Sequence, residues 1–256
     1  MDLGLTGRRA LVTGASRGLG YAIARSLAAE GASVTAVARG PERLAQLAGT
    51  PETAGRIRTR TCDLSDGTAI AGLADDLATT DILVINTGGP PPGTAAETTD
   101  ATWTAQFESM FLSAIRLTRL ALPGMRQRGF GRIIAVVSSG VIQPIPNLGV
   151  SNALRMGLVG WAKTLATEVA AAGITVNCLA PGRIATDRVA EIDQGRARRE
   201  GLTIEEVERQ SRATIPAGRY GEPNDLAAMA AFLASSRSAY ITGSIVRVDG
   251  GMIRSV

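Results

Sequence analysis

The 256-residue sequence contains no histidine. This excludes a Ser-His-Asp triad, a cysteine nucleophile paired with histidine and any metal site with histidine ligands. The two cysteines, Cys62 and Cys178, lie far apart and supply neither a zinc cluster nor a disulfide framework. We therefore expect a protein without a bound metal, with reduced thiols and a cytoplasmic location.

Lysine and aromatic residues are also scarce. Lys163 is the single lysine among 27 basic residues, and aromatic residues make up 4% of the chain. No basic run is interleaved with aromatic residues, so we expect no nucleic-acid partner despite the net charge of +4. No apolar run is long enough to span a bilayer, and residues 1–5 do not begin a signal peptide, so we expect no membrane association.

Apolar residues make up 45% of the chain, enough for a sizeable core. Short, nearly continuous apolar runs alternate with longer helical stretches and predict seven strands, at 10–13, 33–38, 57–62, 82–85, 133–137, 174–178 and 245–248. Such runs are typical of parallel strands covered on both faces. The sequence therefore predicts an α/β fold: a single Rossmann-like, doubly wound domain over residues 1–256, with a seven-stranded parallel sheet and helices on both faces.

One segment, residues 187–221, is long and highly charged and follows the end of the sixth predicted strand. Within it, Thr203 and Glu206 have the spacing of a helix capping box. The segment is either a substrate lid or a solvated excursion. We favour the lid, because loops at that edge of such a sheet line the ligand crevice.

Glycines fill the turn between the first strand and the first helix, where Gly14, Gly18 and Gly20 have the spacing Gly-x-x-x-Gly-x-Gly. Glycine permits positive φ and lets the backbone approach a phosphate closely. The helix that follows offers free N–H groups and a positive dipole end. The turn therefore predicts a dinucleotide site.

This spacing resembles that of the short-chain dehydrogenase/reductase family, and the resemblance covers essentially the whole chain. Asn86-Thr87-Gly88-Gly89 is similar to the family's Asn-Asn-Ala-Gly with two departures, and Asp249-Gly250-Gly251 resembles a signature near its C-terminus. The resemblance implies a set of cofactor-binding residues: Gly14, Ser16, Arg17, Gly18, Leu19, Gly20, Arg39, Asp63, Leu64, Asn86, Gly88, Pro181, Gly182, Ile184 and Thr186.

The end of the second strand bears on which nicotinamide cofactor binds. Members that prefer NAD(H) place a carboxylate there for the adenosine ribose, whereas this strand ends in Val37-Ala38-Arg39. Arg39 and Arg17 can clamp a 2′-phosphate through forked, charge-assisted bonds. We therefore expect NADP(H). The alternative is NAD(H), with both arginines merely solvated.

The catalytic residues depart from the family pattern of Ser, Tyr-x-x-x-Lys and an earlier Asn. Counted from Gly131, the serine position falls on Ser138, the tyrosine on Ser151 and the lysine on Arg155, and the asparagine position falls on Met110. The chain thus resembles a divergent, 3-oxoacyl-ACP-reductase-like subgroup with Ser-Asn-x-x-Arg. Nothing in the sequence itself supports acyl carrier protein as a partner.

We expect Ser138, Ser151 and Arg155 to be the catalytic residues. A serine hydroxyl is a poor acid near neutral pH, and arginine stays protonated, so it stabilises an oxyanion but shuttles no proton. Arg155 would bind either the nicotinamide ribose or a carboxylate or enolate, which makes an anionic small-molecule substrate one expectation. Arg183 and Arg188 either extend that anion site or are ordinary surface residues.

Three functions remain open at this point. The first is an NADP(H)-dependent oxidoreductase acting on a carbonyl or alcohol through an atypical proton path. The second is a non-redox enzyme on the same scaffold, such as an isomerase, cyclase or dehydratase. The third is a silent NADP(H)-binding protein. The family resemblance also implies a homotetramer or homodimer, with helices at about 103–127 and 151–171 forming the subunit contact.

Overall fold

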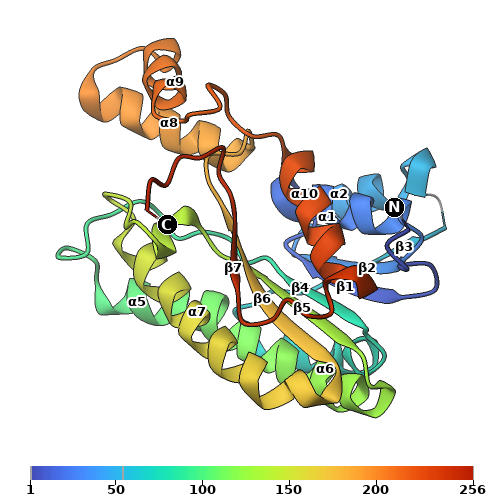
Figure 1. Cartoon of the computed structure of the whole chain (residues 1–256). Coiled ribbons are helices and arrows are strands. Elements are labelled where there is room, and N and C mark those ends of the chain that lie inside the picture. Colours follow the sequence, from blue (N-terminus) through green and yellow to red (C-terminus); the bar gives the residue numbers. More distant parts are fainter. Residues whose placement is uncertain (1, 54, 256) are drawn as a thin grey trace.

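A computed structural model describes residues 2–53 and 55–255. All seven strands form one parallel sheet in the order β3-β2-β1-β4-β5-β6-β7 (Figure 1). The strands are β1 (Arg9–Thr13), β2 (Ser33–Ala38), β3 (Ile57–Thr61), β4 (Ile82–Ile85), β5 (Gly131–Val136), β6 (Ile174–Pro181) and β7 (Ile245–Val248). The predicted α/β fold with a seven-stranded parallel sheet is confirmed, and each strand lies within a few residues of its expected range.

Helices cover both faces of the sheet (Figure 1). The α-helices are α1 (Gly18–Ala29), α2 (Pro41–Ala48), α3 (Gly67–Ala71), α4 (Ala74–Ala78), α5 (Asp100–Gln106), α6 (Ser113–Arg128), α7 (Gly149–Val169), α8 (Asp187–Glu200), α9 (Ile204–Ala213) and α10 (Pro223–Ala234). A π-helical turn, η2 (Phe107–Leu112), joins α5 to α6, and a 3₁₀ turn, η3 (Ser139–Val141), follows β5.

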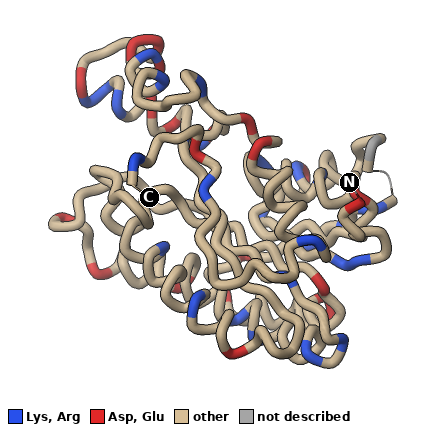
Figure 2. Tube along the Cα trace, viewed as in Figure 1, with Lys and Arg blue, Asp and Glu red and all other residues tan. Residues whose placement is uncertain are grey.

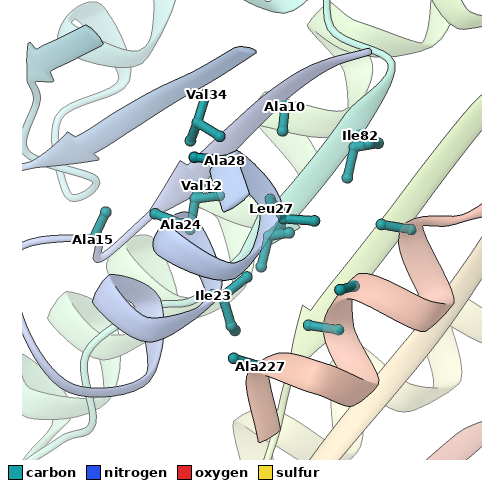
Figure 3. Packing of buried hydrophobic residues seen from close by; sticks show 14 of the residues in the cluster. Ala10, Val12, Ala15, Ile23, Ala24, Leu27, Ala28, Val34, Ile82 and Ala227 are labelled. Carbon is teal, nitrogen blue, oxygen red and sulfur yellow. The ribbon is translucent and has the colours of Figure 1, made fainter. Parts of the chain in front are cut away.

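The core consists of two layers because alternate strand residues point to opposite faces. Val12 of β1 belongs to the layer under α1 and α10, where it packs with Ile23 and Leu27 (Figure 3). Its neighbour Leu11 belongs to the opposite layer, with Leu117 of α6 and helix α7. Both faces of the strand are therefore apolar, which explains the nearly continuous hydrophobic runs in the sequence.

The strand order reverses between β1 and β4, which pair in parallel with Ala10 opposite Ile82. From β1 the chain moves outward through β2 and β3, and from β4 it moves outward in the other direction through β5, β6 and β7. In open α/β sheets, ligands bind beyond the carboxyl ends of the strands at such a switch point. The structure therefore predicts a site beyond Thr13 and Ile85.

The charged segment 187–221 forms α8 and α9, which project from the carboxyl edge of the sheet (Figure 1). The Oγ1 atom of Thr203 accepts a hydrogen bond from the Glu206 amide at 3.2 Å, as the predicted capping box requires. The Glu206 carboxylate instead accepts bonds from Arg209 and Gln210, so the box is half formed. Charges of both signs are intermixed on these two helices (Figure 2).

Candidate active site

The glycine-rich turn follows β1 and is too tightly packed to admit side chains. Gly14 and Gly18 have φ values of +60° and +56°, which L side chains rarely adopt. A Cβ on Gly20 would lie 2.3 Å from the Gly14 carbonyl oxygen, closer than real contacts allow. No side chain caps the N-terminus of α1, so its first N–H groups remain available to a ligand. The turn fits the backbone cradle that a pyrophosphate requires.

The ends of β1 and β4 are fastened together beneath this turn. The Thr13 hydroxyl donates to the Asn86 carbonyl at 3.2 Å and accepts from the Asn86 amide at 2.9 Å. The Asn86 side chain donates to the Gly14 carbonyl at 3.4 Å. A Cβ on Gly88 would meet nothing within 4 Å, and the buried hydroxyl of Thr87 has no hydrogen-bond partner in the described part of the chain. Open space and an unpartnered polar atom both fit a ligand beside this turn.

The residues expected at the adenosine end lie on the exposed rim beyond β2 and β3. The Asp63 carboxylate accepts bonds from the amide and hydroxyl of Ser65, and these bonds hold the pKa of Asp63 below its usual range. The positive charge of Arg39 contributes to the same shift. Leu64 is half-buried beside Asp63, and Ser16 is half-buried within the glycine-rich turn.

Arg17 is not merely solvated. It lies 3.5 Å from Asp187 and 3.4 Å from Glu191, both on α8. Arg43 of α2 lies 3.9 Å from the same Asp187. The sequence alone does not single out Arg43, because it lies in an amphipathic helix and its contact with Asp187 depends on the tertiary fold. Arg17 and Arg43 thus meet at Asp187, while Arg39 faces Asp63 at the ends of β2 and β3.

The end of β6 returns the chain to the glycine-rich turn. A Cβ on Gly182 would lie 2.7 Å from the Asp249 Cα, so this passage also requires glycine. Ile184 is buried and forms a parallel bridge with Gly221. The methyl group of Thr186 lies 3.5 Å from where a Gly18 Cβ would stand. The structure therefore brings the Pro181–Thr186 passage and the glycine-rich turn together.

The predicted catalytic residues gather at the end of β5. The Ser138 hydroxyl accepts from the Gly140 amide at 3.1 Å and begins η3. Arg155 donates from Nη1 to the Val136 carbonyl at 2.7 Å and from Nε to the Ser151 hydroxyl at 3.3 Å. The spacing of four residues places Ser151 and Arg155 on one helix face, as expected. No hydrogen bond joins Ser138 to Ser151 in the part of the chain described.

The guanidinium of Arg155 stays charged at neutral pH. Burial lowers its pKa to about 10, and the positive charge of Arg188 contributes to the shift. That value still lies far above neutrality. Arg155 can therefore hold an anion or stabilise developing negative charge, but it cannot act as a proton shuttle there.

The asparagine position of the family pattern is apolar in this chain. Met110 lies in the π turn η2, is 1% exposed and packs with Val150, Leu154 and Trp103. It provides no polar side chain to the site. Of the three tyrosines, Tyr220 bonds to Asp193, Tyr240 is fully exposed and Tyr21 packs on the core. None of their hydroxyls bonds to the predicted catalytic residues in the described regions.

Asn152 has a positioning role that the sequence did not reveal. Its side chain accepts from the Ile145 amide at 3.3 Å and donates to the Ile145 carbonyl at 2.9 Å. A Cβ on Gly140 would lie 2.6 Å from the same side-chain oxygen. Asn152 thus fastens the 140–145 loop to α7. Its adjacency to Ser151 was a signal, but only the fold shows which loop it holds.

Arg183 and Arg188 have different environments. Arg183 forms an ion pair at 2.5 Å with Asp193, which is 1% exposed and also accepts a bond from the Tyr220 hydroxyl at 2.7 Å. Arg183 therefore anchors α8 through Asp193. Arg188 donates to the Pro90 carbonyl beyond β4 and remains beside the crevice.

A dinucleotide cradle at the switch point of a parallel sheet, with polar residues at the next strand ends, defines a nucleotide-binding α/β enzyme. Residues 14–253 match the family described as enoyl-(acyl carrier protein) reductase. The chain belongs to the short-chain dehydrogenase/reductase family. The expected class, an oxidoreductase of this family that uses a nicotinamide cofactor, is confirmed.

Curated relatives and solved structures match along nearly their full length. The chain is 37% identical to nodulation protein G of Rhizobium sp. (strain N33), covering 97% of this chain and 98% of that protein. It is 36% identical to the 3-oxoacyl-[acyl-carrier-protein] reductase FabG of Vibrio cholerae, covering 98% and 99%. The structure of L-sorbose reductase from Gluconobacter frateurii with NADPH and L-sorbose matches with a TM-score of 0.93, 33% identity and full coverage of both chains. No described helix is both long and apolar enough to cross a membrane.

Proposed function

We propose that this protein is an NADP(H)-dependent oxidoreductase of small carbonyl or alcohol substrates, with a site built on Ser138, Ser151 and Arg155 in place of a Tyr-Lys pair. The observation that carries the proposal is the glycine cradle beside the Thr13–Asn86 clasp, because its positive-φ glycines and the free N–H groups that begin α1 suit a dinucleotide phosphate. Ser-Asn-x-x-Arg at the start of α7 is the basis for placing the chain in the divergent subgroup.

Arg155, Ser138 and Ser151 have different roles in the proposed reaction. A bound nicotinamide supplies the hydride. Arg155, held by Val136 and Ser151, stabilises negative charge on the bound substrate. The hydroxyl of Ser138 or Ser151 relays a proton from water to the reacting oxygen of the substrate, because Arg155 retains its own proton near neutral pH.

Preference for NADP(H) is supported by the adenosine end. The strand β2 ends without a carboxylate, and Arg17, Arg39 and Arg43 near the ends of β1 and β2 supply guanidiniums that suit a 2′-phosphate. L-Sorbose reductase, a structural neighbour, is complexed with NADPH. The segment 187–221 is proposed as a lid, since Arg17 in the glycine-rich turn pairs with its first helix.

A fluorescence titration with NADPH and, separately, NADH tests the cofactor assignment. We expect micromolar NADPH binding and much weaker NADH binding. The second arm measures NADPH oxidation across a panel of carbonyl compounds, in which Arg155→Ala should lose at least about a hundredfold in kcat/KM, as on loss of an oxyanion donor. Absence of NADPH binding by the folded protein would overturn the proposal, and an unimpaired Arg155→Ala variant would overturn the role of Arg155.

A non-redox enzyme is the second candidate. It is favoured by one observation, that none of the three tyrosine hydroxyls bonds to the Ser138–Ser151–Arg155 group in the described regions. Such an enzyme turns over its substrate without any change in cofactor absorbance. Strict consumption of one NADPH per product molecule would exclude it.

A homotetramer or homodimer is also proposed. The exposed Met156 of α7 and the exposed Phe107, stacked on Phe111 at 5.2 Å, form apolar surface on the helices expected at the subunit contact. Light scattering coupled to size exclusion gives the mass directly. A monomer at all concentrations would overturn this proposal.

A further inference from the structure

Arg155 carries a buried positive charge that no acidic side chain neutralises. The residue is 8% exposed, and its two protein partners, Val136 and Ser151, are both uncharged. Within residues 2–53 and 55–255, no carboxylate forms an ion pair with it. Because removing a charge from water is costly, buried charges are normally paired. A buried cation without a counter-ion therefore needs either several backbone carbonyls around it or an anionic ligand.

Arg132 shows what a purely structural buried arginine looks like in this same protein. It is 3% exposed and donates to three backbone carbonyls, those of Gly131, Gly173 and Ser235. Its guanidinium also lies 4.2 Å from the Phe130 ring centroid. Arg155 has one carbonyl and one hydroxyl as acceptors, and no described residue accepts a hydrogen bond from its Nη2 atom. A face of the Arg155 fork is thus left for a ligand.

Arg188 brings a second guanidinium to the same place. It donates to the Pro90 carbonyl, and its Nε lies 3.5 Å from where a Gly89 Cβ would stand, over the turn that follows β4. Arg155 rests on the end of β5, the strand paired with β4 through Ile85 and Ala135. Arg188 thus lies over the turn that follows β4, and Arg155 lies at the end of the neighbouring β5; the positive charge of Arg188 also contributes to the lowered pKa of Arg155.

Glu191 does not cancel this positive charge. Its carboxylate lies 3.6 Å from Arg188 and is shared with Arg17, from which it lies 3.4 Å. Solvent screens this exposed pair, and no carboxylate in the described regions pairs with Arg155, so the charge of Arg155 stays uncompensated. Two like charges held close together are unfavourable until an anion lies between them.

We propose that Arg155 and Arg188 form a two-point site for the carboxylate of the substrate, so that the substrate is a small oxo or hydroxy acid. The oxo or hydroxy part of this assignment rests on the proposed function, whereas the carboxylate site stands without it. A carboxylate suits the site because its planar pair of oxygens matches the fork of a guanidinium. Arg155 holds the anion from α7, and Arg188 holds it from α8.

Calorimetry of the NADPH-saturated protein tests the site with oxalate and with its neutral isostere oxamide. We expect oxalate to bind and oxamide to bind at least about tenfold more weakly, as expected for losing a charge-assisted bond. Arg188→Gln and Arg155→Gln should each weaken oxalate binding by a similar factor. Arg196→Gln is the matched control, since Arg196 lies on the same helix but pairs with Glu200.

Equal affinities for oxalate and oxamide, or an Arg188→Gln variant with unchanged oxalate affinity, would overturn the inference. Tighter binding of inorganic phosphate than of oxalate would overturn its carboxylate part. If Arg155→Gln does not fold, Arg188→Gln and Arg155→Lys decide the matter, the latter retaining part of the affinity. Oxalate binding without NADPH oxidation by any oxo acid would leave the anion site standing and reject the redox function. NADPH oxidation by neutral ketones alone would support the redox function and reject the anion site.

Discussion

Arg17 in the glycine-rich turn lies 3.5 Å from Asp187, the first residue of α8. The residue proposed to hold a cofactor phosphate is thus also a contact of the proposed lid. Both side chains are more than half exposed, so the pair contributes little to stability and can be exchanged for a phosphate contact. In the proposed function, occupancy of the adenosine end and the position of α8 would therefore be coupled through Arg17, with Arg43 on the same carboxylate.

The first prediction concerns this arginine. Arg17→Ala should weaken NADPH binding by about tenfold to a hundredfold, the value of one charge-assisted bond, and leave NADH binding nearly unchanged. Fluorescence titration with both cofactors measures the two affinities. Arg25→Ala, in the helix α1 that follows the turn, is the control. An equal loss for NADPH and NADH would show that Arg17 does not read the 2′-phosphate.

The second prediction concerns the glycine cradle. Gly20→Ala places a Cβ 2.3 Å from the Gly14 carbonyl, so the turn must open, and we expect cofactor binding to fall at least about tenfold. Gly160→Ala is the control, because a Cβ there meets nothing within 4 Å and alanine stabilises a helix by about 0.5–1 kcal/mol. Melting temperatures with and without NADPH measure both effects. Normal NADPH binding by Gly20→Ala would refute the cradle.

The third prediction concerns Asn152. Asn152→Ala removes both bonds to Ile145 and should cost about 1–3 kcal/mol of unfolding free energy. The 140–145 loop beside Ser138 should loosen, so kcat/KM falls while NADPH affinity stays constant. Ala153→Ser, at the exposed neighbouring position, is the control. If NADPH affinity and kcat/KM fell together, Asn152 would not act through this loop alone.

The fourth prediction concerns the two thiols. Burial raises the pKa of Cys178 to about 12, and burial with the nearby Asp63 and Asp66 raises that of Cys62. Native protein near pH 8 should therefore react slowly with a thiol reagent, and both thiols should react after unfolding.

The same pKa shift gives stability a pH dependence with a definite sign. An unfolded thiol ionises near pH 9, whereas native Cys178 keeps its proton. The contribution of Cys178 to the free energy of unfolding is therefore fully present below about pH 9 and is lost as pH rises toward 12. The slope is at most about 1.4 kcal/mol per pH unit for this group. Urea titrations of wild type and Cys178→Ala between pH 8 and about 11 measure it. Equal slopes for the two proteins would reject the assignment.

The fifth prediction concerns the anchor of α8. Tyr220→Phe removes one bond to the buried Asp193 and should destabilise the native state by about 1–2 kcal/mol. Limited proteolysis should then cleave within 187–221 faster than in wild type. Arg209→Ala, which removes an exposed pair with Glu206, should not change the cleavage rate. Equal cleavage of wild type and Tyr220→Phe would argue against an anchored lid.

The strands were predictable because their residues report a local property. Leu11 and Val12 are both apolar because the sheet is covered on both faces, and such an apolar run can be recognised in a short stretch of sequence. The glycine-rich turn was equally predictable, since Gly14 and Gly18 have positive φ. Strand ends varied by a few residues, as with β6, which continues to Pro181.

The site's internal contacts were not predictable, because they join residues distant in sequence. Nothing local to Arg17 indicates Asp187, 170 positions away. The sequence likewise left Arg183 and Arg188 equivalent, although the fold pairs one with buried Asp193 and leaves the other at the crevice. Residue type defined the available chemistry, and tertiary structure decided which charges were already neutralised.

The reversal of strand order between β1 and β4 divides the sequence of this protein into two parts. The glycine-rich turn and the rim with Arg39 and Asp63 follow the first three strands, whereas Met110, Ser151 and Arg155 come after β4, as do Asn86 and the Pro181–Thr186 passage. The Thr13–Asn86 clasp is where the two parts meet. Substitutions at Met110, Ser151 and Arg155 can therefore change the proposed chemistry while the glycine-rich turn after β1 keeps its conformation.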